Sequence, residues 1–125
     1  MEIKYYNFDN LPKGGPYSHI VEAGDFLFIS GAIPFDTIKN TMVNDDISKA
    51  TELILNNISL ALKDAGSSIE KIVKVTVYLK DMTKFSEMND IYKKFFLQNP
   101  PARTTVGVSD LPGGAPIEID AIAIR

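Results

Sequence analysis

The middle of the chain alternates between helical and extended patterns, and no other feature restricts the fold as strongly. Apolar residues recur at helical spacing over 47–65, directly after two aspartates that can cap a helix and before Gly66, which can end one. An alternating, β-branched stretch follows at 72–80, and a second apolar stripe predicts a helix from about Thr83 to Leu97. Crossovers of this kind are right-handed, so we expect both helices on one face of a sheet.

Further strands flank this middle region on both sides. The sequence predicts them at 2–8, 18–22, 26–30, 103–108 and 117–124. Ala23-Gly24-Asp25 is typical of a hairpin, the apolar run Phe26–Ile29 of a central strand, and the polar stretch Asp36–Asn44 of a loop. The element order is then β-β-β-α-β-α-β-β. We therefore expect an α+β fold in which residues 1–125 form a single domain, with one mixed sheet and two helices on one face.

Two of the predicted strands are apolar on both faces. In the 72–80 strand, Val73, Val75, Val77 and Leu79 are expected on one face, and Ile72, Thr76 and Tyr78 on the other. In the closing strand, Ile122 and Ile124 oppose Ala121 and Ala123. A sheet with helices on one side only would leave an apolar face too large for a monomer, so we expect a homo-oligomer with cyclic symmetry.

Composition excludes several kinds of chemistry. The 125 residues include no cysteine and one histidine, which excludes disulfides, thiolate nucleophiles and Cys- or His-rich metal sites. We expect neither a metal nor a cofactor. The net charge of −3 argues against a nucleic-acid-binding surface. No apolar run can span a bilayer and no signal-peptide pattern is present, so we expect a soluble, cytoplasmic protein without membrane association.

One arginine and two carboxylates near the C-terminus form the strongest candidate site. Arg103 follows a pair of prolines, and Glu118 and Asp120 interrupt a strand that is otherwise apolar. Buried charges are costly unless they are paired or hydrogen-bonded. We expect Arg103 and Glu118 to face one cleft, where the guanidinium would hold a small carboxylate and Glu118 would act as a general base. The alternative is a structural ion pair between Arg103 and either carboxylate. For Asp120 we expect a structural role.

Five blocks of sequence occur in an order and spacing that chance would rarely produce. They are Gly15–Ser18, Ile29–Pro34, Val73–Asp81, Met88–Tyr92 and a final block that runs from Pro101-Ala102-Arg103 to Ile117-Glu118-Ile119. Together these blocks resemble the RidA family, also called YjgF/YER057c-like, of reactive imine deaminases. The resemblance implies a chorismate-mutase-like α+β fold and a homotrimer with its clefts at the subunit interfaces.

The resemblance also implies a reaction and roles for individual residues. The family hydrolyses 2-imino acids such as 2-iminobutanoate and 2-iminopropanoate, which derive from enamines released by pyridoxal-phosphate enzymes, to 2-keto acids and ammonia without a cofactor. Arg103 matches the arginine that holds the substrate carboxylate, and Glu118 matches the carboxylate that positions or activates water. The further substrate-binding positions match Tyr17, Ser30, Asn89 and Thr105.

Three positions depart from the usual family pattern. Thr105 stands where a cysteine is frequent, Ala32 where a glutamine is frequent, and His19 where glutamine or another polar residue is usual. Because Arg103 and Glu118 are retained, these departures are expected to affect pocket shape and substrate preference more than the activity. His19 has no partner motif for a catalytic triad, so we expect it on the surface of a strand with no catalytic role.

Two other functions fit parts of the sequence. The chain can be a non-catalytic module that binds small carboxylates, such as 2-ketobutyrate or an amino acid, and regulates a partner. Retention of Glu118 favours the enzyme, because a second carboxylate would repel such a ligand. An endoribonuclease or translation inhibitor, as some family members are described, is disfavoured by the acidic charge and the single histidine.

Overall fold

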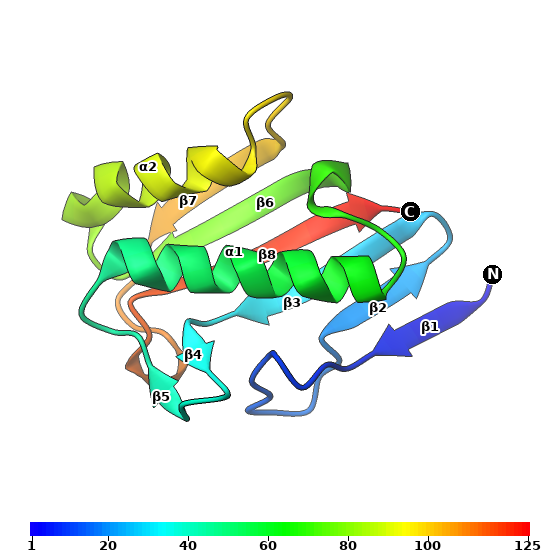
Figure 1. The fold of residues 1–125 in the computed structure, drawn as a ribbon, viewed down its shortest axis with the longest axis horizontal. Coiled ribbons are helices and arrows are strands. Elements are labelled where there is room, and N and C mark those ends of the chain that lie inside the picture. Colours follow the sequence, from blue (N-terminus) through cyan, green and yellow to red (C-terminus); the bar gives the residue numbers. More distant parts are fainter.

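Six strands form one mixed sheet in the computed structural model, which describes all of residues 1–125. The strands are β1 (Ile3–Tyr6), β2 (Ile20–Ala23), β3 (Phe26–Ala32), β6 (Ile72–Leu79), β7 (Ala102–Gly107) and β8 (Ile117–Ile124). Their order in the sheet is β1-β2-β3-β8-β6-β7, and all neighbours are antiparallel except β6 and β7. The predicted α+β fold with one mixed sheet is therefore confirmed, and β1 and β7 are the edges of the sheet (Figure 1).

Two helices, α1 (Ile47–Asp64) and α2 (Phe85–Phe95), cover the same face of the sheet, as predicted (Figure 1). The Asp46 side chain caps α1 by accepting from the Lys49 amide at 3.1 Å. Just beyond the other end, Gly66 has a φ of 87°, which glycine adopts without strain and which ends the helix.

The second helix is shorter than the predicted 83–97 segment at both ends. Before it, Met82–Lys84 form a separate 3₁₀ turn, η2, in which the Asp81 carboxylate accepts from the Thr83 amide. After it, Phe96 has a φ of −130° and a ψ of 63°, which take the chain out of the helix before the two prolines. Two further 3₁₀ turns are η1 (Ile69–Lys71) and η3 (Pro112–Gly114).

The expected loop at 36–44 contains a small hairpin instead. Strand β4 (Phe35–Asp36) pairs with β5 (Thr41–Met42), apart from the main sheet. The Asp36 carboxylate accepts from two backbone amides of the turn at 3.0 Å, and Asn40 adopts a φ of 56°. The turn places Phe35 directly opposite Met42.

The first two residues of β6 face the opposite way from the prediction. The register of β6 against β8 shifts between Ile72 and Lys74. This irregularity turns Ile72 into the core and leaves Val73 43 % exposed. From Val75 onward the strand alternates as the sequence predicts, with Val75, Val77 and Leu79 all buried.

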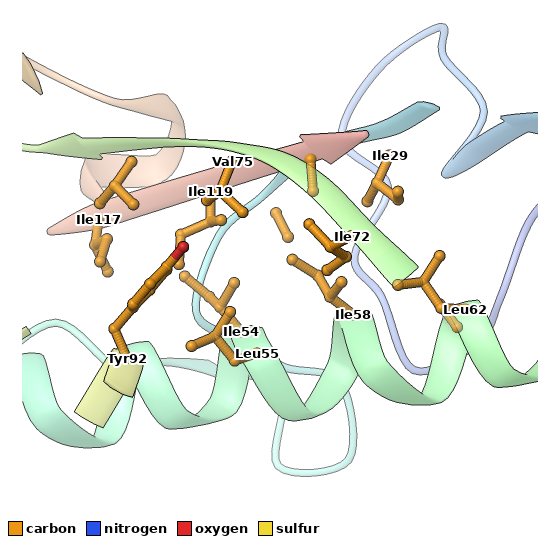
Figure 2. Packing of buried hydrophobic residues seen from close by; sticks show 14 of the residues in the cluster. Ile29, Ile54, Leu55, Ile58, Leu62, Ile72, Val75, Tyr92, Ile117 and Ile119 are labelled. Atoms are coloured by element: carbon orange, nitrogen blue, oxygen red, sulfur yellow. The ribbon is translucent and has the colours of Figure 1, made fainter. Parts of the chain in front are cut away.

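The hydrophobic core lies between the sheet and the helices. Figure 2 shows the apolar side chains of α1 facing those of β6 and β8. They include Ile54, Leu55, Ile58 and Leu62 of α1, Ile72 and Val75 of β6, and Ile117 and Ile119 of β8. Tyr92 reaches into the same cluster from α2 and is only 6 % exposed. Since each large apolar side chain contributes about 1.5–3 kcal/mol when fully buried, this layer is the main source of stability.

The face of the sheet without helices carries an apolar patch. Phe26 pairs with Ile124 and Phe28 with Ile122 across β3 and β8, and these four residues define the patch. Phe26 and Phe28 are 48 % and 45 % exposed. An exposed patch of this kind is typical of an interface between proteins. The oligomer thus stays a prediction that the surface favours.

Candidate functional site

A cavity of about 910 Å³ opens between the 12–17 loop, the end of β3, the β4–β5 hairpin and η3. Three predicted site residues line it, namely Tyr17, Ser30 and Glu118. Ile33, Phe35 and Met42 form an apolar wall. The cavity therefore combines a carboxylate, two hydroxyls and apolar surface, which suits a small organic ligand.

Glu118 lies in this cavity at the start of β8, against the backbone of Gly31. A Cβ on residue 31 would collide with the Glu118 carboxylate, so the close approach requires glycine. Burial and the negative charge of Asp120 raise the pKa of Glu118 above its usual 4.5. A raised pKa makes the carboxylate a stronger base, which suits taking a proton from water.

Asp120 lies on the same face of β8 but has a partner within the sheet. Its carboxylate accepts from the Tyr78 hydroxyl at 2.9 Å. This hydrogen bond is the main cause of a raised pKa at Tyr78. The contact fits the structural role expected for Asp120.

Tyr17 and Ser30 lie on the wall of the cavity with hydrogen-bonding capacity to spare. The Ser30 hydroxyl donates to the Ser18 carbonyl at 2.7 Å, which leaves its oxygen able to accept. The Tyr17 hydroxyl is 3.3 Å from the Gly14 amide and 3.4 Å from the Pro12 carbonyl, and both contacts are long. The side chain of Tyr17 can therefore exchange these contacts for a ligand.

Arg103 lies on the other face of the sheet, on the edge strand β7 below α2. Its guanidinium carbon is 4.7 Å from the centre of the Tyr92 ring and 5.7 Å from the centre of the Phe85 ring. None of the salt bridges of the chain includes Arg103. The alternative of an ion pair with Glu118 or Asp120 is therefore wrong within one chain, and the guanidinium is free to bind an anion.

Asn89 and Thr105 lie on the Arg103 side of the sheet. Asn89 is on α2 about one helical turn from both Phe85 and Tyr92, and Thr105 is on the same face of β7 as Arg103. The Thr105 and Tyr92 hydroxyls are buried without a hydrogen-bond partner. Burial also raises the pKa of Tyr92 to about 12, so its hydroxyl keeps its proton. The unpaired guanidinium on this face is suited to an anionic ligand.

The predicted site residues therefore form two groups, and the expected single cleft for Arg103 and Glu118 is wrong within one chain. Sheet pairing gives the reason. Arg103 aligns with Val75 of β6, whose side chain is in the core. Glu118 aligns with Tyr78, whose side chain points to the opposite face. We call Tyr17, Ser30 and Glu118 the Glu118 group, and Asn89, Arg103 and Thr105 the Arg103 group.

His19 is buried, which corrects the prediction of a surface histidine. His19 is 4 % exposed and lies in a bend just before β2. The Phe8 amide donates to Nδ1 at 2.9 Å, and Nε2 lies 3.0 Å from the Pro12 carbonyl. The predicted strand began at residue 18, whereas β2 begins at Ile20 and the preceding loop encloses the ring.

The apolar wall of the cavity was not predicted from the sequence. Phe35 and Met42 reach it from the β4–β5 hairpin, which was expected to be a loop. The available signal was a short polar turn between two apolar residues, which is typical of a hairpin.

The structure contains neither a metal-binding cluster nor a membrane-spanning helix. No three histidine, aspartate or glutamate side chains are grouped so that they could hold a metal ion. Neither helix combines the length and the apolar character that crossing a bilayer requires.

Comparison with known proteins places this chain in a family. The family described as Endoribonuclease L-PSP matches residues 9–125. A RutC family protein of Pyrococcus horikoshii is 48 % identical over 118 residues, which are 94 % of each chain. The solved structure of YyfA from Yersinia pestis, a conserved Rid family protein, has a TM-score of 0.94 and 38 % identity and covers 99 % of this chain and 100 % of that one. TdcF of E. coli, solved with bound serine, has a TM-score of 0.91 and 33 % identity, with 98 % of both chains covered.

The fold and the cavity define a small α+β protein with a candidate ligand site around a carboxylate. The chain belongs to the Endoribonuclease L-PSP family, which is the RidA (YjgF/YER057c-like) family that the sequence blocks indicated.

Proposed function

We propose that this chain hydrolyses reactive 2-imino acids, such as 2-iminobutanoate and 2-iminopropanoate, to 2-keto acids and ammonia. The observation that carries the proposal is the unpaired guanidinium of Arg103, held by two aromatic rings on the same face as the unsatisfied Thr105 hydroxyl. A cation in this setting binds a carboxylate well, and every 2-imino acid has one. Membership of the Rid family supports the same class of substrate.

The Arg103 group binds the substrate carboxylate in this proposal. A guanidinium forms two parallel hydrogen bonds to a carboxylate, which fixes its orientation as a lysine ammonium would not. The Thr105 hydroxyl can donate to the same carboxylate, and the Asn89 amide can bind the imine end. Binding of serine by TdcF, as its structure is described, supports a small carboxylate as ligand for a protein of this fold.

The Glu118 group carries out the hydrolysis. Glu118 takes a proton from water while the water oxygen bonds to the imine carbon, and the C=N bond becomes a C–N single bond. The imine reacts in its protonated form, so this step gives a neutral carbinolamine. The proton on Glu118 then passes to the nitrogen; as the C–N bond breaks, Glu118 takes the hydroxyl proton and the C–O bond becomes the carbonyl of the 2-keto acid. The leaving ammonia accepts this proton from Glu118 and departs as ammonium. General acid–base catalysis of this kind contributes about 10²–10⁴-fold. Tyr17 and Ser30 orient the substrate and the water by hydrogen bonds.

The two groups complete one site when two subunits meet. Arg103 lies on β7, which is an edge strand and so borders a free side of the sheet. Glu118 lies in a cavity that is open to the surroundings of the chain. In a cyclic homotrimer every subunit would supply its Arg103 group to one neighbour and its Glu118 group to the other. The apolar patch on β3 and β8 supports such an assembly.

A coupled assay tests the reaction. Threonine dehydratase generates 2-iminobutanoate from threonine, semicarbazide traps the imine, and the protein is expected to suppress semicarbazone formation. Arg103→Lys should lose most of the suppression. The same substitution at the only other arginine, Arg125→Lys, should retain it, since Arg125 pairs with Glu22 away from the cavity.

The assay also separates the main alternative, a non-catalytic carboxylate-binding protein. If the wild type forms an intact oligomer but does not suppress the semicarbazone, the deaminase proposal fails for this substrate. Titration with 2-ketobutyrate then decides whether the same site binds carboxylates without catalysis, because Arg103→Lys should weaken that binding while Arg125→Lys should not.

A further inference from the structure

The single histidine of the chain connects three segments around the cavity. His19 accepts from the Phe8 amide through Nδ1 at 2.9 Å, and Nε2 lies 3.0 Å from the Pro12 carbonyl. The backbone carbonyl of His19 accepts from the Ser30 amide at 2.9 Å. The ring lies edge-on to the Tyr17 ring, with their centres 6.2 Å apart. Pro12, Tyr17 and Ser30 all line the cavity, whereas His19 does not.

These contacts fix which nitrogen of His19 carries the proton. A backbone amide can only donate, so Nδ1 must be unprotonated to accept from Phe8. A neutral imidazole then has its proton on Nε2, and this proton is donated to the Pro12 carbonyl. The ring is thus a rigid connector with an acceptor at one end and a donor at the other.

We propose that His19 is a positioning residue, which holds the 12–17 loop against β3 and so sets one wall of the cavity that Glu118 also lines. The Tyr17 hydroxyl makes only long hydrogen bonds to its own loop, at 3.3 and 3.4 Å, so those bonds fix the ring weakly. The edge-on contact with the buried His19 ring places the Tyr17 ring instead. The effect on catalysis rests on the proposed deaminase function, but the effect on the loop does not.

Two variants separate the hydrogen bonds from the volume of the side chain. His19→Gln keeps one acceptor and one donor on a side chain long enough to reach both partners. His19→Leu keeps an apolar side chain of similar size and removes both hydrogen bonds. It leaves the Phe8 amide and the Pro12 carbonyl without their partners.

Hydrogen exchange and steady-state kinetics provide the test. In His19→Leu, amide exchange should accelerate in peptides that cover residues 9–18 and stay unchanged in α1, and the KM for 2-iminobutanoate generated in situ should rise about tenfold with kcat within about twofold. His19→Gln should resemble the wild type in both. A lower kcat at unchanged KM, with faster exchange throughout the chain, would mean simple destabilisation and would overturn the proposal. So would a His19→Leu variant that matches the wild type.

NMR of the wild-type protein provides a test that does not depend on whether a variant folds. Because His19 is the only histidine, the imidazole region of a long-range ¹H–¹⁵N NMR spectrum reports one ring. The spectrum should show a proton on Nε2 and none on Nδ1, and a proton on Nδ1 would overturn the proposal. If the wild type lacks deaminase activity, the proposed function fails while exchange and NMR still decide whether His19 positions the loop.

Discussion

The side chains of Arg103 and Glu118 project from opposite faces of one sheet. Arg103 aligns with the buried Val75 of β6, whereas Glu118 aligns with Tyr78 on the face without helices. A single chain therefore cannot bring this guanidinium and this carboxylate to one ligand. If both act on one substrate, they must come from different subunits.

Mixing two inactive variants tests whether sites are shared between subunits. Homo-oligomers of Arg103→Ala and of Glu118→Gln should each lose most of their deaminase activity. In oligomers assembled from equal amounts of both chains, about a quarter of the shared sites receive an intact Arg103 and an intact Glu118. We therefore expect about a quarter of the wild-type activity to return, measured by suppression of semicarbazone formation.

The control for this mixture is a chain that carries both substitutions, mixed with either single variant. Such oligomers contain no site with both residues intact and should stay inactive. If the mixture of the two single variants also stays inactive, although mass spectrometry shows mixed oligomers, Arg103 and Glu118 do not share a site.

The close approach of Glu118 to Gly31 predicts that substitution of this glycine impairs catalysis. A Cβ at position 31 would overlap the Glu118 carboxylate, so Gly31→Ala must push that side chain out of place. We expect a loss of at least about tenfold in kcat, since a displaced base transfers protons poorly. The matched control is Gly14→Ala, which lines the same cavity but places its Cβ in open space. Equal losses in both variants would contradict this explanation.

Local sequence patterns predicted which segments form helices and strands better than they predicted the face of the sheet on which each side chain lies. The apolar spacing of α1 and the aspartate before it were sufficient to predict that helix, because capping and amphipathicity act within one segment. Ile72 was assigned to the wrong face because a bulge against β8 depends on a distant strand.

The site shows the same limit of local reasoning. Arg103 and Glu118 were both predicted as site residues. Whether their side chains share a face of the sheet depends on how β7 and β8 each pair with β6, which no short motif encodes. His19 was assigned to the surface because its burial comes from the 8–12 segment folding over it.

The aromatic rings around Arg103 predict a second pair of contrasting variants. Tyr92→Phe keeps the ring 4.7 Å from the guanidinium and removes a buried hydroxyl without a partner, so the protein should be at least as stable as the wild type. Tyr92→Leu removes the cation–π contact, worth about 0.5–2 kcal/mol, and should weaken binding of 2-ketobutyrate by about two- to thirtyfold. Calorimetric titration measures both affinities. If Tyr92→Phe weakens binding as much as Tyr92→Leu, the hydroxyl rather than the ring is responsible.

The raised pKa of Glu118 predicts a pH-dependent cost to stability. Burial and Asp120 raise the folded-state pKa of Glu118 above 4.5, so the unfolded chain releases this proton first as pH rises. The resulting loss in the free energy of unfolding is absent below about pH 4. It grows as pH rises from 4.5 through the raised pKa of Glu118 in the folded protein, and it is constant above that pKa. Glu118→Gln removes this cost, so the Tm gain over the wild type should increase from pH 4 to pH 7 in thermal unfolding.

Glu118→Gln also tests whether two subunits share a site, when its effect on stability is compared in the wild type and in Arg103→Ala. In a shared site the neighbour's guanidinium would partly offset the cost of the Glu118 charge. Glu118→Gln should then stabilise the Arg103→Ala protein more than the wild type at pH 7, in thermal unfolding at one fixed protein concentration. Within one chain the two residues lie on opposite faces of the sheet, so without a shared site the two gains should be equal. Equal gains would therefore argue against shared sites by a measurement that needs no substrate.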